Sequence, residues 1–399
     1  MNFSEENLIG MSKHVGDLLM KFKFFSHVDP KEWNENLSLC DYSTFFQTAE
    51  FLSKKDPDRY PVFIYIYDDA ENIQGQLGLI ISKSKSGHST KILRKFTKMA
   101  SKIGGRGSWT SGPIIHSNDK SIRTKVIQTL FLALDKVVQD HNLMILDGYT
   151  PPQDFDIDES YLTEFKKHGF EQQNFLTLAS DLNQDLEAFW QKIKKSARND
   201  VTKAKREGIV IKEISTKEEL TNYKLLTKKW AQTKGIEIAD ADTKQIDEDW
   251  LYLKSGIQKF FLAYKEQEIL AGLRVGCFNK IAYTHQVLNS YSKIGNVAGP
   301  LLTWHAINWA KDNGMKVYDF SGGEAPPSNK KDLKAYTEQW ESLFAYKRKW
   351  SGNEFPYYHF IKIINKERYK LYRILSKPDT FLRNYKKKRF TRPRNGVRK

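Results

Sequence analysis

Segments with the period of a β-strand and segments with the period of an α-helix alternate along this chain of 399 residues. In the first half, β-branched and aromatic runs at 62–67 and 76–81 flank a turn, which predicts a hairpin. Apolar residues then recur at helical spacing over 122–138, and strands are expected at 143–146 and 175–179. Because amphipathic helices and strands bury their apolar sides against one another, we expect the first half to form a mixed α/β unit.

The second half repeats this order of elements. A long helix is predicted over 186–206, where apolar residues fall on one face and Gly208 ends the run. Further strands and helices are expected at 209–214, 220–230, 259–264, 269–275, 281–287, 301–312 and 316–320. The similarity lies in element order rather than in sequence identity, and it predicts two tandem α/β (α+β) units, at 1–180 and 181–373.

A basic tail follows the two units, at 374–399. From Arg383 onward it holds nine basic residues and no acid, a composition typical of a mobile segment. The whole chain has 64 Lys and Arg against 48 Asp and Glu, so its formal net charge is +16 and the tail carries more than half of the excess. An acidic partner is therefore expected: a phosphate-bearing substrate, an RNA or an anionic membrane surface.

Composition also excludes several kinds of site. Cys40 and Cys277 are the only cysteines, which excludes a disulfide framework and a thiolate zinc site, and the nine histidines show no metal-binding spacing. No metal is therefore expected. The N-terminal segment lacks the apolar core of a secretion signal, and no apolar run approaches the roughly 18 residues of a membrane-spanning helix. These features predict a soluble, cytoplasmic protein.

Glycines cluster at 103–113. The spacing of Gly107 and Gly112 is that of a Walker loop, but Pro113 and Ile114 stand where such a loop needs Lys and Ser or Thr. A turn at the end of a strand is the better interpretation. Arg106 and the neighbouring backbone amides remain a candidate anion site.

Basic residues crowd one side of the predicted helix at 186–206, opposite its apolar stripe: Lys192, Lys194, Lys195, Arg198, Lys203, Lys205 and Arg206. Glu187 and Glu207 flank these seven cations and Asp200 lies among them, so ion pairs along the helix do not balance the positive charge. One interpretation is the solvated face of a docked helix. The other is a surface that recognises phosphate or carboxylate groups.

Two segments of the second half combine charged and aromatic residues. Asp319 ends a strand that is expected to be buried, where a carboxylate needs partners. Lys347 stands between Tyr346 and Trp350, a setting that can hold a cation rigidly in a cleft. The loop 290–299 leads into a predicted helix, whose N-terminus also favours an anion.

These segments make the chain similar to the FemAB family of peptidoglycan-bridge aminoacyltransferases and its FemX-like members. Residues 195–208 resemble the family's basic helix with its following glycine, and Gly112–Ile115 resembles a strand of its first domain. Residues 318–323 resemble the D-F-G/S-G strand end, with Ser321 where the family more often has Gly. Residues 344–352 resemble the Y-R-F-K-x-x-F-G element, and together these stretches span most of 110–352.

The resemblance implies two tandem GNAT-like (acyl-CoA N-acyltransferase-like) domains, mixed sheets flanked by helices, with a substrate channel between them. It implies transfer of an aminoacyl group, usually from aminoacyl-tRNA as co-substrate, to an amine of a cell-wall precursor or a related phosphate-bearing acceptor, without a bound cofactor. By this resemblance Lys347 would stabilise charge in the transition state. Asp319, singled out as a carboxylate in a strand expected to be buried, is the second residue expected to be catalytic. The expected substrate-binding residues are Arg198, Asn199, Lys195, Lys203, Tyr283, Tyr346 and Arg106.

Two other functions stay open. The same fold can serve an acyl-CoA donor and a sugar-nucleotide or polysaccharide amine, although residues 292–297 do not meet the CoA signature [QR]-x-x-G-x-[GA]. A nucleic-acid-binding protein without enzymatic activity also fits the charge, although no RNA-recognition motif is present. In each case the basic tail is compatible with peripheral contact at the inner, anionic face of the membrane, where lipid-linked acceptors lie.

Overall fold

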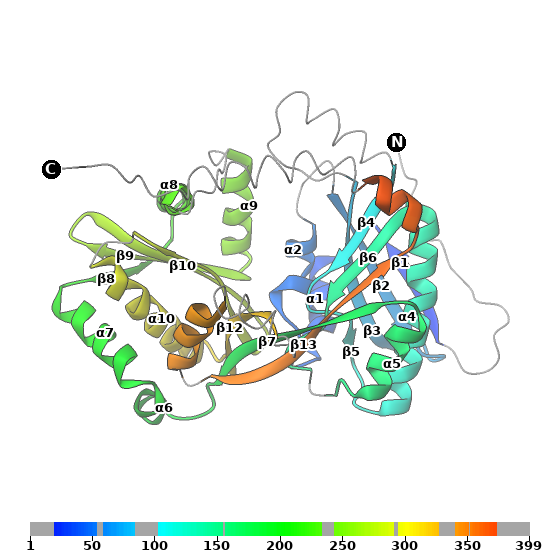
Figure 1. The fold of residues 1–399 in the computed structure, drawn as a ribbon, viewed down its shortest axis with the longest axis horizontal. Coiled ribbons are helices and arrows are strands. Elements are labelled where there is room, and N and C mark those ends of the chain that lie inside the picture. Colours follow the sequence, from blue (N-terminus) through cyan, green and yellow to red (C-terminus); the bar gives the residue numbers. More distant parts are fainter. Residues whose placement is uncertain are drawn as a thin grey trace, which may run out of the picture.

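The computed structural model describes residues 20–53, 59–83, 103–154, 156–233, 243–290, 294–326, 340–350 and 352–372. The predicted basic tail and the N-terminal segment lie outside these residues. Within the described part of the chain, thirteen strands form one continuous mixed sheet with helices on both faces. In Figure 1 the first half of the chain lies on the right and most of the second half on the left.

The first half contributes six strands and a helical layer on each face of its part of the sheet. The strands are β1 (Lys21–Phe25), β2 (Arg59–Tyr67), β3 (Ile73–Ser82), β4 (Gly105–Trp109), β5 (Ile114–Ile115) and β6 (Leu143–Tyr149). The helices are α1 (Pro30–Ser38), the 3₁₀ turn η1 (Phe45–Gln47), α2 (Ala49–Leu52), α4 (Lys120–His141) and α5 (Glu159–Lys167). Leu130 and Phe165 of α4 and α5 pack against Leu146 on one face, and Trp33 of α1 packs against Phe63 on the other.

The second half contributes the remaining strands and its own two helical layers. The strands are β7 (Glu171–Asp181), which belongs to the first unit by sequence but pairs with β12 and β13, and β8 (Val210–Glu213), β9 (Gln258–Lys265), β10 (Glu268–Phe278), β11 (Ile281–Asn289), β12 (Val317–Glu324) and β13 (Asn353–Ile363). The helices are α6 (Leu186–Lys192), α7 (Lys195–Arg206), α8 (Lys217–Thr233), α9 (Thr243–Lys254), α10 (Gly295–Asp312) and the 3₁₀ turn η2 (Arg348–Trp350). Phe261 of β9 packs with α6, α7 and α10, whereas its neighbour Phe260 packs with α8 on the opposite face.

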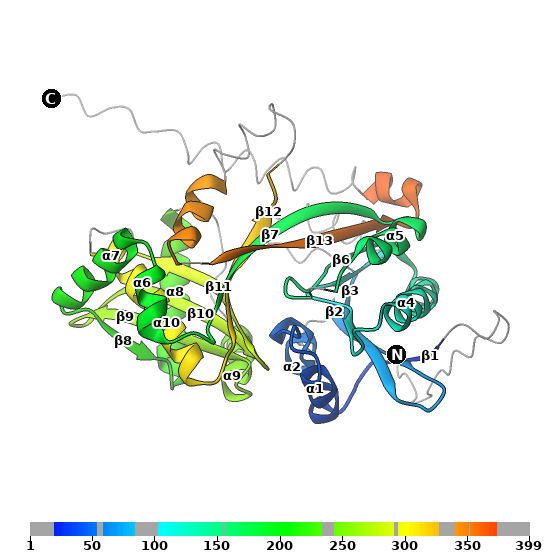
Figure 2. The same cartoon turned by 90° about the horizontal axis from the view of Figure 1, so that it is seen from below.

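Strands β7 and β13 join the two halves. The strand order is β1-β2-β3-β4-β6-β13-β7-β12-β11-β10-β9-β8, and β5 pairs with β3. Near the C-terminal end of the described chain, β13 pairs antiparallel with β6 of the first half, with His359 opposite Tyr149, and also with β7, with Asn353 opposite Ala179. Figure 2 shows β7 and β13 running side by side from one half to the other, while α1 and α2 face α9 below them. The sheet therefore continues from one unit into the next.

The helix predicted over 186–206 is interrupted, so this prediction is wrong in part. Ile193 and Lys194 have extended backbone conformations (ψ 146° and 138°) and separate α6 from α7. The Lys194 N–H donates to the Lys349 carbonyl at 2.9 Å, a contact across more than a hundred residues that no local pattern encodes. The apolar face still continues across the break, because Phe189, Ile193 and Ala197 are all buried in one core.

Two glycine-containing segments also differ from their predictions. Residues 105–109 form strand β4, between β3 and β6, so Gly105 and Gly107 lie within a strand, and the turn expected at the end of a strand comes after it, where the chain bends at Thr110 and Ser111. A Cβ added to Gly107 would lie 2.7 Å from Leu146 Cδ2, so glycine lets β4 lie under this leucine. Helix α10 begins at Gly295 and contains Pro300, whereas a loop was predicted up to Gly299.

Candidate functional site

A buried carboxylate on β12 forms the centre of the candidate site. Asp319 is fully buried, and its carboxylate accepts hydrogen bonds from Gln153 Nε2 at 2.6 Å, Thr177 Oγ1 at 2.6 Å and the Ser321 N–H at 2.7 Å. Burial raises the pKa of Asp319, while these three donors and Lys347 act in the opposite direction. The donors come from the loop after β6, from β7 and from β12, so both halves of the chain hold this one carboxylate.

The backbone next to Asp319 is irregular. The pairing of β12 with β7 shifts register between Asp319 and Gly322, and Ser321 within this bulge has a positive φ of 61°. The left-handed region favours glycine, so Ser321 holds a backbone conformation that residues with a side chain rarely adopt. The Ser321 hydroxyl donates to the Thr284 carbonyl of β11 at 2.8 Å and so ties the bulge to the next strand.

Lys347 lies at this bulge. It ends the helical segment 340–347, its exposed fraction is 7%, and its Nζ donates to the Ser321 carbonyl at 2.6 Å. Its Nζ also lies 5.8 Å from the centre of the Phe344 ring. Burial lowers the pKa of Lys347 from 10.5 to about 8, and the nearby Asp319 carboxylate limits this decrease. The two residues expected to be catalytic therefore lie together, and the amine still carries a proton at neutral pH.

Tyrosines surround this pair, and sequence reasoning expected some of them. Tyr283 on β11 stands opposite Asp319 in the pairing of β11 with β12, and burial followed by the Asp319 charge raises its pKa. Tyr357 on β13 was not expected; burial, then Tyr283 and Asp319, raises its pKa. Tyr346 precedes Lys347 in the chain; its hydroxyl is 3.0 Å from Thr303 Oγ1 of α10, and burial raises its pKa to about 12.

Arg106 lies away from the pair. On the sheet, β6, β13 and β7 separate its strand β4 from β12. Its Nε donates to Asp147 Oδ1 at 2.6 Å, its Nη2 contacts the other oxygen, and His359 Nε2 lies 3.2 Å from the same carboxylate. The guanidinium thus has an internal partner, and the glycines beside it belong to a strand. The structure does not bring these groups together as an open anion loop.

The candidate residues on α7 lie on the surface beside the pair. Lys195, Asn199 and Lys203 are exposed, and Arg198 is half-buried. Arg198 Nη1 donates to the side-chain oxygen of Gln191 at 2.8 Å and to its carbonyl at 3.2 Å. The helix begins next to η2, which directly follows Lys347 in the chain.

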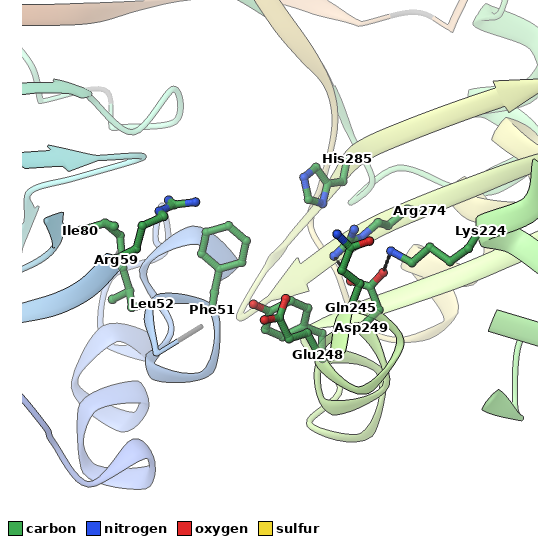
Figure 3. Close-up of a pocket in the computed structure, with 11 residues that line it drawn as sticks. Phe51, Leu52, Arg59, Ile80, Lys224, Gln245, Glu248, Asp249, Arg274 and His285 are labelled. Atoms are coloured by element: carbon green, nitrogen blue, oxygen red, sulfur yellow. Dashed lines mark hydrogen bonds and ion pairs between the residues drawn. The ribbon is translucent and has the colours of Figure 1, made fainter. Parts of the chain in front are cut away.

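A cavity of about 310 Å³ opens between the two halves (Figure 3). Residues of both halves line it: Phe51, Leu52, Arg59, Ile80, Lys224, Gln245, Glu248, Asp249, Tyr252, Arg274 and His285. Asp249 is buried; its carboxylate contacts Lys224 and accepts a hydrogen bond from Arg274 Nη2 at 3.0 Å. Arg274 Nε also donates to Gln258 at 2.7 Å.

Lys347 does not line this cavity, but the two features share strand β11. His285 lines the cavity, and the carbonyl of the preceding residue, Thr284, accepts the hydrogen bond from Ser321. Sequence reasoning missed the cavity residues because each belongs to a different element and no motif joins them. A buried acid between two cations becomes visible only in three dimensions.

Groups that could hold a metal ion, three or more His, Cys, Asp or Glu together, are not found among the described residues. No helix in the described part of the chain is long and apolar enough to cross a membrane.

Comparisons with known proteins identify the fold. The sequence matches no protein-family model and no curated protein. Among solved structures, the chain is similar to FemX, with a TM-score of 0.66 and 14% identity over 87% of this chain and 99% of that one. It is also similar to a tandem GNAT protein from the clavulanic acid biosynthesis pathway, with a TM-score of 0.51 and 9% identity over 87% and 99% of the two chains.

A third similar structure is L-PGS from Bacillus licheniformis, with a TM-score of 0.50 and 12% identity over 87% of this chain and 97% of that one. At these identities the similarity concerns the fold. The chain has a GNAT-type acyltransferase fold in tandem, which confirms the predicted fold class.

Proposed function

We propose that this protein is an N-acyltransferase of the FemX type, which transfers an aminoacyl group from aminoacyl-tRNA to an amine of a cell-wall precursor or a related acceptor. The observation that carries the proposal is the buried Lys347 ammonium, held by the Ser321 carbonyl beside Asp319. The tandem GNAT fold and its similarity to FemX support it.

The chemistry of the proposed reaction needs a fixed cation. When the acceptor amine attacks the ester carbonyl, a C–N bond forms and negative charge develops on the carbonyl oxygen. A positioned cation stabilises that charge and lowers the barrier. When the ester C–O bond breaks, the proton lost by the amine is balanced by the proton that the leaving ribose oxygen gains.

Lys347 suits this role because its ammonium has one hydrogen-bond partner among the described residues. An ammonium has three N–H groups, so two remain for the developing oxyanion. The Ser321 carbonyl and the Asp319 charge orient the ammonium, and the bulge in turn orients the Ser321 carbonyl. We assign Lys347 as the catalytic residue and Asp319 as the positioning residue that keeps it protonated.

We assign the acceptor to the cavity between the two halves. Its polar wall holds Lys224, Arg274 and Arg59 as cations, and Glu248 and Asp249 as acids. Phe51, Leu52 and Ile80 form an apolar side. A pocket with an apolar side and a few fixed charges fits an acceptor that carries an acidic group on a larger body.

The proposal is tested by incubating the purified protein with labelled aminoacyl-tRNAs and a panel of amines, including a nucleotide-linked peptide precursor. We expect label to appear in an amide product. Absence of transfer from every aminoacyl-tRNA would contradict the proposal.

A second class of donor, a CoA thioester, is tested in parallel. The reason is the similarity of the fold to a tandem GNAT protein whose structure was determined without AcCoA. A rise in melting temperature with CoA, together with transfer from acyl-CoA, would favour that donor instead.

A further inference from the structure

The outer face of α7 carries cations without acidic partners. Lys195, Lys203, Lys205 and Arg206 are exposed, and none of them forms an ion pair with a residue that the structure describes. Other cations of this protein differ: Arg106, Lys224 and Arg274 each contact an aspartate. The nearest acid at the helix end, Glu207, already pairs with Lys265 at 3.1 Å.

These cations form a stripe. Ala197, Val201 and Ala204 are buried against the core and fix the orientation of α7. On the opposite side Lys195, Asn199, Thr202 and Arg206 recur every three or four residues, and the exposed cations Lys203 and Lys205 flank this row, one on each side. At about 1.5 Å per residue, the stripe extends over about 16 Å from Lys195 to Arg206.

The stripe begins next to the candidate site. The Lys194 N–H donates to the Lys349 carbonyl in η2, and Lys349 is close in sequence to Lys347. Farther along the helix, the charge of Asp200 acts on the Tyr346 hydroxyl, so the middle of α7 also lies near this segment. Figure 1 shows α7 along the outer side of the second half, beside α10.

We propose that this stripe, Lys195, Lys203, Lys205 and Arg206, binds the phosphate backbone of the RNA that carries the acyl group. This inference rests on the proposed function, since it concerns the same donor. Cations spread over about 16 Å suit a chain of phosphates rather than one small anion. The exposed positions of α7 are all polar, so the helix has no apolar side chain to insert into a membrane surface.

The test compares two variants of equal charge. One carries Lys195→Gln, Lys203→Gln and Arg206→Gln; the control carries Lys31→Gln, Lys120→Gln and Lys166→Gln, which are exposed residues of the first half. Binding of an acceptor-stem RNA hairpin with a single-stranded 3′ end is measured by fluorescence anisotropy over a range of salt concentrations. Melting temperatures of both variants show that they are folded.

In the α7 variant we expect weaker binding of the hairpin. The slope of log K (the binding constant) against log salt concentration should become less steep by about 2 to 3, because each phosphate that a cation neutralises contributes about 0.7 to 0.9 to it. The control should keep the slope of the unmodified protein. If the protein binds the hairpin and both variants retain that slope, the stripe does not bind the RNA and this inference is wrong, while the transferase proposal stands.

Other outcomes separate this inference from the proposed function. Transfer from acyl-CoA without any RNA binding would overturn both. Binding to vesicles of phosphatidylcholine and phosphatidylglycerol that the α7 variant loses, without RNA binding, would make the stripe a membrane-binding surface and overturn the RNA inference.

Discussion

Gln153 donates a hydrogen bond from Nε2 to the buried carboxylate of Asp319 at 2.6 Å, although 166 positions separate the two residues in the chain. Gln153 follows β6 of the first half, and Asp319 lies on β12 of the second. Through this contact the first half takes part in the site that the proposed reaction uses. The side-chain oxygen of Gln153 has no hydrogen-bond partner among the described residues, so the hydrogen bond to Asp319 is the one that orients this amide.

Replacing Lys347 by Met should reduce transfer by about a hundred- to a thousandfold, the usual effect of removing one oxyanion-stabilising group. The loss should appear in kcat, because the cation acts on charge that develops in the transition state. Steady-state kinetics with aminoacyl-tRNA checks it. Since Lys347→Met also leaves the Asp319 carboxylate without its cation, the double variant with Asp319→Asn is the matched control for stability. Activity near that of the unmodified protein in Lys347→Met would contradict the assigned role.

Activity should fall as the pH rises through about 8, because the lowered pKa of Lys347 makes its ammonium lose its proton there. In Lys347→Arg the guanidinium keeps its charge, so the alkaline decrease should move to higher pH in any activity that remains. The pH dependence of kcat checks this. If activity instead rises through pH 8 and Lys347→Arg removes that rise, Lys347 acts as a base.

The same group should make stability depend on pH. The pKa of Lys347 is about 8 in the folded protein and has its ordinary value of 10.5 when the chain unfolds. Between these values the unfolded chain binds more protons, so the free energy of unfolding should increase with pH across this interval. Chemical denaturation across the alkaline range measures it. Lys347→Met should flatten the curve in that interval; an unchanged slope would contradict the lowered pKa.

Gln153→Ala should destabilise the fold by about 1 to 3 kcal/mol, because a buried carboxylate loses one of its three donors. The pKa of Asp319 should rise further. Because the Asp319 charge helps Lys347 to keep its proton, the alkaline fall in activity should move to lower pH. Gln128→Ala is the matched control, since it removes an amide from the Glu164 carboxylate, outside this site. If Gln153→Ala lowers stability but leaves the pH dependence of activity unchanged, Gln153 stabilises the fold without affecting Lys347, and this prediction is wrong.

Gly322→Ala should disrupt the bulge. A Cβ at this position would lie 2.2 Å from the Leu176 carbonyl oxygen and 2.8 Å from the Tyr357 hydroxyl, so the strands would have to separate. We expect a loss of about 1 to 3 kcal/mol in the free energy of unfolding and a fall in activity. Ser321→Gly is the contrast: it removes the hydroxyl contact with Thr284 but relieves the positive φ, and the backbone carbonyl that holds Lys347 remains. Its stability should stay within about 1 kcal/mol of the original.

The sequence alone predicted most elements, because local periodicity determines them. The hairpin of β2 and β3, helix α4 and strand β12 follow from apolar spacing and turn residues, and their repeated order predicted the tandem fold. Asp319 and Lys347 were also visible, since a carboxylate in an apolar strand and a lysine among aromatics stand out from their surroundings.

Tertiary structure decided the features that depend on contacts between distant segments. The break between α6 and α7 requires the carbonyl of Lys349, and the position of β13 depends on pairing with β6 and β7. The partners of Asp319, and the cavity around Asp249, come from elements whose separation in the chain carries no periodic signal. Local sequence determines backbone preferences within a few residues. Which side chains share a buried site depends on the order in which the strands pair and on how the helices pack against the whole sheet.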